Sequence, residues 1–212
     1  MTTIKITKMN GCGNDFVIID KLEFEKTNLS MSDMAKKICD RNFGVGGDGM
    51  IIPDLTPNHK TDIAWFFYNS DGSTAQMCGN GMRCFAKYVT DKKLVNKNKF
   101  SVMTGAGIIT PEILDNGLIK VNMSKPILEP EKIPFKGNNI LNFDITIKDI
   151  TLKANAISMG NPHCVIFTDN DVYEMAKTYG PELEKHYLFP EKTNVEFIKI
   201  KSRNEVDFCV YE

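Results

Sequence analysis

Residues 69–89 read NSDGSTAQMCGNGMRCFAKYV, and this stretch decides the expected fold. Its first part is rich in glycine, asparagine and serine, which are the residues that form turns. Its second part repeats apolar residues at helical spacing, with Met82, Phe85, Ala86 and Val89 on one face. The sequence therefore predicts a turn that ends at Cys78 and an amphipathic helix that begins directly after it.

Short apolar stretches on both sides of this helix predict strands. In the first half they cover residues 4–7, 17–20, 50–52, 63–68, 100–103, 108–113 and 118–123, with a hairpin turn at 115–117. In the second half they cover residues 144–147, 151–157, 165–168, 195–199 and 205–210. Two more helices are predicted, one at 31–38 behind a Ser30 cap and one that starts at 172 and stops at Gly180-Pro181. This organisation predicts an α/β (α+β) chain with two similar domains, 1–122 and 123–212.

The composition excludes several classes of function. The chain has 212 residues and a net charge of −1, so it offers no basic surface to nucleic acid. Its most apolar stretch, 63–68, is far shorter than the roughly 20 residues that span a bilayer, and its N-terminus has no apolar signal region. Its six cysteines are spread without the density of a disulfide scaffold. We expect a cytoplasmic protein with reduced thiols, whose partners are small molecules or proteins and not a membrane.

Cys78 is the candidate reactive group. The first amides of a helix have no intrahelical partner and carry partial positive charge. A cysteine at this point can serve as a thiolate, and the same amides can bind a carboxylate. The alternative is a buried cysteine that only fills space. A metal site is not expected, because Cys78 and Cys84 are six residues apart and no matching Cys or His pair follows.

Three further clusters combine glycine with polar residues. The segment 11–16 (GCGNDF) satisfies the needs of a tight turn between two strands. The segment 44–49 (GVGGDG) matches G-x-G-x-x-G, but it follows a helix and precedes a strand, the reverse of a dinucleotide-binding unit, so we interpret it as a turn. In 159–164 (MGNPHC), His163 and Cys164 are neighbours on an extended chain and point to opposite sides, so a catalytic Cys-His pair is not expected.

Four segments, in this order, resemble the signatures of the diaminopimelate epimerases. They are KMNGCGNDF at 8–16, NSDGS to MCGNGMRC at 69–84, MGNPH at 159–163 and TNVEF at 193–197. The resemblance covers the whole chain. It implies two similar domains, each with mixed or antiparallel strands wrapped round a central helix, and an active site in the cleft between them. It also implies interconversion of LL- and meso-diaminopimelate, for lysine and peptidoglycan synthesis, without pyridoxal phosphate or any other cofactor.

The resemblance also assigns roles to individual residues. Cys78 would be one of two bases, because a proton that leaves one face of the α-carbon and returns to the other needs a group on each side. The amides of Gly79 and Asn80 would meet the α-carboxylate of the substrate, and Glu212 would contact its α-amino group. The asparagines that would hold the amino and carboxylate groups are Asn14, Asn69, Asn161 and Asn194. A binding position that is glutamine in some members falls on Gly49, which receives no role.

The sequence departs from the family at its end. Members continue after Glu212 with Arg-Gly and then a second cysteine, which opens the helix of the second domain. We therefore expect a chain that is C-terminally truncated, with domain 123–212 incomplete, and that is inactive as it stands because the second base is missing. Cys84 lies about 9 Å along the same helix and cannot oppose Cys78 across one carbon. The alternatives are a proline or hydroxyproline racemase, which carries His where this chain has Asn80, and a substrate-binding pseudoenzyme. The sequence leaves open whether the chain forms a homodimer.

Overall fold

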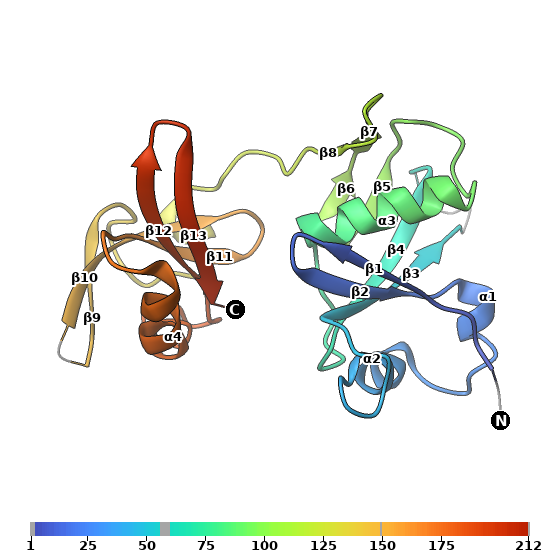
Figure 1. Cartoon of the computed structure of the whole chain (residues 1–212), viewed down its shortest axis with the longest axis horizontal. Helices are drawn as coiled ribbons and strands as arrows, with labels where there is room; N and C mark the ends of the chain where they lie inside the picture. Colours follow the sequence, from blue (N-terminus) through green and yellow to red (C-terminus); the bar gives the residue numbers. More distant parts are fainter. Residues whose placement is uncertain (1–2, 56–59, 149, 212) are drawn as a thin grey trace. The chain divides into compact units, whose positions relative to one another are not determined.

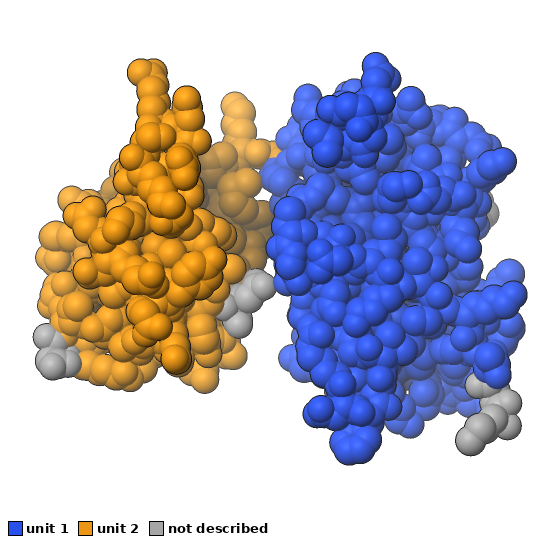
Figure 2. Space-filling model, viewed as in Figure 1, with its two compact units in different colours: residues 1–123 blue, residues 124–212 orange. Residues whose placement is uncertain are grey.

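The computed structural model describes residues 3–55, 60–148 and 150–211. The chain forms two compact units, Met1–Met123 (unit 1) and Ser124–Glu212 (unit 2), which are coloured separately in Figure 2. Each unit combines a β-sheet with few helices, so the predicted mixed α/β class is confirmed. None of the helices in the described ranges has the length and hydropathy needed to cross a lipid bilayer.

Unit 1 is built on a six-stranded mixed sheet of order β1-β2-β3-β4-β5-β6 (Figure 1). Antiparallel and parallel pairs alternate across it, and α2 and α3 connect the two parallel pairs. Two further strands form a separate hairpin around Gly117, as the sequence predicts. The elements are β1 (Thr7–Gly11), β2 (Asn14–Ile18), α1 (Lys21–Phe24), α2 (Met31–Cys39), β3 (Gly49–Asp54), β4 (Ile63–Asn69), α3 (Gly79–Asp91), β5 (Val102–Thr104), β6 (Gly107–Ile109), β7 (Pro111–Ile113) and β8 (Ile119–Val121).

The central strands of the unit 1 sheet, β2, β3 and β4, are buried on both faces. Along β2, Phe16 and Ile18 pack with α3, whereas Val17, and Ile19 directly after the strand, pack with α2 on the other side. Successive side chains of a strand point to opposite faces, so strands covered on both faces become apolar throughout. The apolar face of α3 that the sequence predicts is the centre of the first cluster, in which Phe85 is fully buried.

The turn that joins β1 and β2 consists of Cys12 and Gly13. Both residues have positive φ, +52° and +99°, which is the backbone of a two-residue hairpin turn with the strand-matching twist. The turn interpretation of 11–16 is therefore confirmed. The strands predicted at 4–7 and 17–20 lie closer to this turn than expected, because backbone pairing extends through polar residues that carry no apolar pattern.

Helix α2 begins behind Ser30, which caps it as predicted. The Ser30 Oγ accepts a hydrogen bond from the Asp33 N–H at 3.1 Å and donates to the Asp33 carboxylate at 2.7 Å. These bonds satisfy one of the amides that the helix leaves without an intrahelical partner.

Replacing Ser30 by alanine is expected to lower the free energy of unfolding of unit 1 by about 1 kcal/mol, because the cap is lost. Urea denaturation followed by the fluorescence of Trp65, the chain's single tryptophan, measures this change. Ser30→Thr keeps the capping oxygen and serves as the matched control, with stability close to that of the original chain. An alanine variant as stable as the threonine variant would contradict the role of the cap.

Unit 2 is built on a five-stranded sheet of order β13-β12-β11-β10-β9 (Figure 1). All its pairs are antiparallel except β11–β12, which α4 connects. The helix packs on one face of this sheet, together with residues from the segment before β9. The elements are η1 (Pro130–Lys132), β9 (Phe143–Ile147), β10 (Ile150–Ser158), β11 (Pro162–Phe167), α4 (Val172–Leu183), β12 (Asn194–Ser202) and β13 (Glu205–Tyr211).

Helix α4 does not stop at Gly180-Pro181, so that prediction is wrong. The helix continues through Pro181 to Leu183. Proline removes one intrahelical hydrogen bond, but Leu183 is fully buried and Gly180 lies tightly against the Tyr211 ring, where an added Cβ would come within 2.5 Å. Burial of these residues stabilises the last turn, and local sequence does not show it.

The two faces of strand β13 differ. Cys209 and Tyr211 pack into the core of unit 2, whereas the alternate residues Val206, Phe208 and Val210 are exposed. The facing residue of β12, Ile200, is 64% exposed. Unit 2 therefore presents an apolar strip on the sheet face opposite its core.

Candidate active site

Cys78 occupies the N-cap position of α3, as the sequence predicts. Its backbone is extended (φ −146°, ψ 122°), and its sulfur accepts a hydrogen bond from the Gly81 N–H at 3.4 Å. The side chain is partly buried. Gly79 and Asn80 form the first helical positions, so their amides lie where a helix has no intrahelical acceptors for its N–H groups. The start of the helix thus places a thiol beside backbone N–H groups that have no acceptor within the helix.

Two of the predicted site residues meet beside this helix end. The Asn80 Nδ2 donates to the Asn14 Oδ1 at 2.6 Å, across 66 positions of the sequence. Asn14 in turn donates from its Nδ2 to the Asp48 Oδ2 at 3.2 Å. On the other side, the Arg83 guanidinium donates to the Asn80 Oδ1 and, at 3.2 Å, to the Cys12 sulfur. The β1–β2 turn and the start of α3 are therefore joined by one continuous set of hydrogen bonds.

Charged groups hold the base of this turn. The Arg41 guanidinium and then the Lys8 ammonium keep the pKa of Asp15 well below its usual range. Arg41 also pairs with Asp48, at 2.8 Å. Asp48 belongs to the glycine-rich segment 44–49, which is a turn before β3 as interpreted. Asp48 thereby contacts Asn14, one of the predicted site residues. The sequence does not reveal this contact.

Asn69 ends β4 and begins a separate turn. Its Nδ2 donates to the Ser73 Oγ at 3.0 Å, and its backbone N–H donates to the Ser73 carbonyl. Asp71 accepts two hydrogen bonds from Ser73, and these bonds lower the pKa of the Asp71 carboxyl. The segment 69–73 is therefore an ordered turn that presents the exposed Asn69 side chain.

Gly49 has no room for a side chain. An added Cβ would lie 2.7 Å from the Phe67 ring and 2.8 Å from the Tyr68 carbonyl oxygen. A glutamine, which some members of the resembling family carry here, does not fit this backbone. The position therefore supplies no binding side chain in this chain.

In unit 2, Asn161 and Asn194 lie in one neighbourhood. Asn161 follows Gly160, whose φ of +109° makes the turn between β10 and β11. Asn194 opens β12 and is the register partner of His163 on β11. Both asparagines line a cavity of about 220 Å³. The other lining residues are Pro162, Glu184, Glu191, Lys192 and Thr193.

His163 connects this neighbourhood to a buried carboxylate. Its Nδ1 lies 2.5 Å from the Glu196 Oε1 and its Nε2 lies 3.0 Å from the Asn161 Oδ1. Glu196 is only 7% exposed. Cys164 points to the opposite side and is fully buried, and burial raises the pKa of its thiol. A Cys-His pair is thus excluded as predicted. Glu196 was not singled out from the sequence. Its position between the apolar residues Val195 and Phe197 of a strand is the sequence feature that could have indicated a buried carboxylate.

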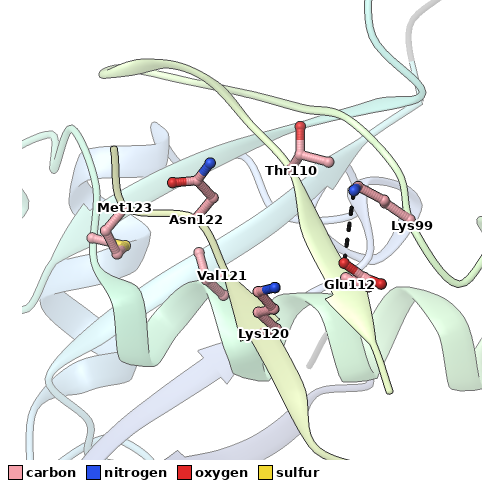
Figure 3. Close-up of a pocket in the computed structure, with 7 residues that line it drawn as sticks. All are labelled: Lys99, Thr110, Glu112, Lys120, Val121, Asn122 and Met123. Atoms are coloured by element: carbon pink, nitrogen blue, oxygen red, sulfur yellow. Dashed lines mark ion pairs between the residues drawn. The ribbon is translucent and has the colours of Figure 1, made fainter. Parts of the chain in front are cut away.

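A second cavity, of about 320 Å³, lies on the β7–β8 side of unit 1 (Figure 3). Lys99 and Glu112 face each other in it, with the Lys99 Nζ 3.7 Å from the Glu112 Oε2. The other lining residues are Thr110, Lys120, Val121, Asn122 and Met123. None of them is a predicted site residue. Met123 lies close to the start of α3, since its sulfur would be 3.4 Å from a Cβ on Gly79.

Glu212 lies outside the described residues. Within the described ranges, no three His, Cys, Asp or Glu side chains lie close enough together to hold a metal ion.

Comparison with known proteins connects these residues to one family. The family model described as diaminopimelate epimerase matches residues 6–129 and 155–212. The diaminopimelate epimerase of Carboxydothermus hydrogenoformans is 44% identical over 211 residues, covering 99% of this chain and 76% of the relative. That of Desulforapulum autotrophicum is 44% identical over 217 residues, with the same coverage.

Solved structures resemble the chain in fold. A probable proline racemase from Agrobacterium radiobacter K84 has a TM-score of 0.68 at 12% identity, covering 98% of this chain and 70% of that one. A phenazine biosynthesis protein of the PhzF family from Bacillus anthracis has a TM-score of 0.64 at 16% identity, covering 100% and 72%. At these identities the likeness concerns the fold alone.

Proposed function

The chain belongs to the diaminopimelate epimerase family of isomerases, and on that premise we propose that it takes part in the interconversion of LL- and meso-diaminopimelate, with Cys78 as one of two acid/base groups. The observation that carries the proposal is the position of Cys78 at the start of α3. Its sulfur accepts the Gly81 N–H beside the amides of Gly79 and Asn80.

Proton transfer at the α-carbon requires a base that is negatively charged and within reach. An N–H group that donates to sulfur favours the thiolate over the thiol, as does the positive end of a helix. The thiolate removes the α-proton, and the carbanion that forms spreads its charge onto the α-carboxylate. The amides of Gly79 and Asn80 stabilise this charge, because preorganised donors strengthen their bonds as charge develops. This chemistry uses the chain's own groups and no cofactor.

The remaining site residues bind the substrate in this proposal. Diaminopimelate carries two ammonium and two carboxylate groups, so a site for it needs several polar side chains. Those assigned to its amino and carboxylate groups are Asn14, Asn69, Asn161, Asn194 and Glu212. The structural support is that Asn14 contacts Asn80 beside Cys78, and that Asn161 and Asn194 line one cavity.

No other cysteine of residues 1–212 suits the second base. Cys84 and Cys39 are buried, and burial raises the pKa of both thiols, that of Cys39 to about 11. Cys164 is fully buried in unit 2, and Cys209 packs against the same core, where partial burial raises the pKa of its thiol. Cys12 is exposed in the β1–β2 turn, where its sulfur accepts a hydrogen bond from Arg83, and the family motif that contains it assigns it no acid/base role. A polypeptide of these residues alone therefore supplies one base, and binds substrate without inverting it.

Alkylation of Cys78 tests the proposal without needing turnover. At pH 8, iodoacetamide is expected to modify Cys78, whereas Cys39, Cys84 and Cys164 stay protected by burial. Diaminopimelate at about ten times its dissociation constant is expected to slow modification of Cys78 by about tenfold. Peptide mass spectrometry measures each site separately. L-lysine, which lacks the second carboxylate, serves as the control ligand. Equal protection by both compounds, or by neither, would contradict the proposed substrate.

The proline racemase reading has no comparable support. Its likeness to this chain lies in the fold, at 12% identity, and the position after Gly79 carries Asn80 and not histidine. The 44% identity to diaminopimelate epimerases favours diaminopimelate over proline as the substrate.

A further inference from the structure

Three side chains of unit 2 form a line that runs from a strand to a turn. The Glu196 Oε1 on β12 lies 2.5 Å from the His163 Nδ1, and the second ring nitrogen, Nε2, lies 3.0 Å from the Asn161 Oδ1. Asn161 belongs to the turn that Gly160 makes between β10 and β11. One imidazole therefore connects a carboxylate within the sheet to a side chain of the turn.

Glu196 lies in an apolar setting. Its neighbours along β12, Val195 and Phe197, are in the core of unit 2, so the Glu196 side chain points to the other face of the sheet. Its register partners on the adjacent strands are Val165 and Val210, whose side chains share that face. Glu196 is nevertheless only 7% exposed. A carboxylate buried between two valines loses its hydration, which destabilises the folded chain unless hydrogen bonds replace it.

These hydrogen bonds are incomplete. The Glu196 Oε2 is fully buried and, within residues 3–55, 60–148 and 150–211, has no hydrogen-bond partner. A buried pair of a carboxylate and a cation or donor is often no more stable than apolar side chains of the same size. The stability of the sheet therefore does not explain a glutamate at this position.

The contact with Glu196 decides how the His163 ring is turned. A carboxylate only accepts hydrogen bonds, so the Nδ1 carries a hydrogen and donates it. If the ring were rotated by half a turn, carbon atoms would lie where the two nitrogens lie now. The buried carboxylate would then lose its hydrogen bond, which is costly for a charged group. Glu196 thus keeps the Nε2 directed to Asn161, where it can donate to the amide oxygen or accept from the amide nitrogen.

We infer that Glu196 is a positioning residue, which acts through His163 and fixes the side chain of Asn161 in the turn between β10 and β11. Asn161 is itself exposed, and an exposed side chain keeps its rotamer freedom unless a contact restricts it. The inference rests on the proposed function only for the role of Asn161 in binding the substrate. It explains why an otherwise apolar part of the sheet carries a buried carboxylate.

The test compares two substitutions of Glu196. Leucine and glutamine have a similar size, but only Glu196→Gln keeps an oxygen that can accept the Nδ1 hydrogen of His163. Nitrogen-15 NMR of the His163 ring and of the Asn161 side-chain amide reports their order in the full chain, without ligand. In Glu196→Leu, exchange of the Nδ1 hydrogen with water is expected to be about tenfold faster, because a hydrogen bond to a charged group is lost. The order parameter of the Asn161 amide is expected to fall with it. Glu196→Gln is expected to stay close to the original chain.

Two controls belong to the same spectra. The Nδ1 of His186 accepts the Leu188 N–H at 3.4 Å, so this second ring serves as an internal reference. Glu184 lines the same cavity as Asn161 but pairs with Lys192. Glu184→Leu, which removes a carboxylate of equal size, is expected to leave the signals of His163 and Asn161 unchanged.

Urea denaturation, followed by the backbone amide signals of unit 2, distinguishes positioning from stabilisation. The midpoint of Glu196→Leu is expected to equal or exceed that of the original chain, because an apolar side chain replaces a buried carboxylate. A lower midpoint, or an unfolded unit 2, would show that Glu196 stabilises the sheet and overturns the inference. Unchanged signals of His163 and Asn161 in Glu196→Leu also overturn it, and so do equal effects of the leucine and glutamine substitutions. No ligand is used, so failure of the proposed function leaves these outcomes readable.

Discussion

A polypeptide of residues 1–212, incubated with LL-diaminopimelate in deuterium oxide, is expected to form no meso isomer. Inversion requires one acid/base group on each face of the α-carbon. Cys78 supplies one of them, and a positioned acid/base group contributes about 10²–10⁴-fold to the rate. Cys84, the nearest other cysteine in sequence, is buried in the core of unit 1 and its thiol pKa is raised by that burial. Proton NMR of the α-hydrogen, together with the isomer ratio, measures the outcome.

Two controls distinguish a chain that lacks the second base from a chain that does not bind the substrate. The protection of Cys78 from iodoacetamide shows that the same sample binds diaminopimelate. Cys78→Ala, which removes the remaining base, is expected to abolish any residual exchange of the α-hydrogen. Deuterium in a meso product formed by the original chain would show that residues 1–212 contain a second base, and the single-base proposal would then be wrong. Meso product from Cys78→Ala would remove Cys78 from the mechanism altogether.

Phe85→Ala is expected to lower the free energy of unfolding of unit 1 by about 3–5 kcal/mol. Phe85 is fully buried on α3, and its ring packs edge-on against Trp65 with centroids 5.5 Å apart. Truncation leaves a cavity in the cluster that holds α3 on the sheet, so it also loosens the element that carries Cys78. Urea denaturation followed by Trp65 fluorescence measures the loss.

Phe43→Ala is the matched control for this substitution. The same side chain is removed, but Phe43 is 95% exposed and contributes to none of the core clusters. Its stability change is expected to stay within about 0.5 kcal/mol. Similar losses in both variants would show that the cluster under α3 is not what stabilises unit 1.

Local features of the sequence were predicted well, because their physical causes are local. The start of α3 after Cys78 follows from a glycine-rich turn and a helical repeat, both readable within residues 69–89. The Ser30 cap and the turn at Cys12 and Gly13 follow equally from neighbouring residues. The predicted end of α4 at Gly180-Pro181 was wrong, because the contacts that extend the helix to Leu183 are not local. The burial of Leu183 and the contact between Gly180 and Tyr211 come from distant parts of the chain.

The polar connections of the candidate site were beyond prediction. Asn80 and Asn14 are 66 positions apart, and His163 and Glu196 are 33 apart. Hydrogen bonds between such residues leave no periodic signal, since they depend on which strand end lies beside which helix end. Arg83 was visible only as part of a motif, and Asp48 only as part of a turn.

By itself, the sequence determined which chemistry is present: a cysteine before a helix, asparagines in turns, and the strands of both units. Propensity, periodicity and turn geometry act over a few residues, so a single chain records them directly. The tertiary structure alone decided the direction in which Asn80 and Asn14 point and the carboxylate that stands behind His163. The physical reason is that a carboxamide or an imidazole can present either a donor or an acceptor to the same neighbour, depending on its rotation or tautomer. Its donors and acceptors are set by the charged groups that packing brings to it.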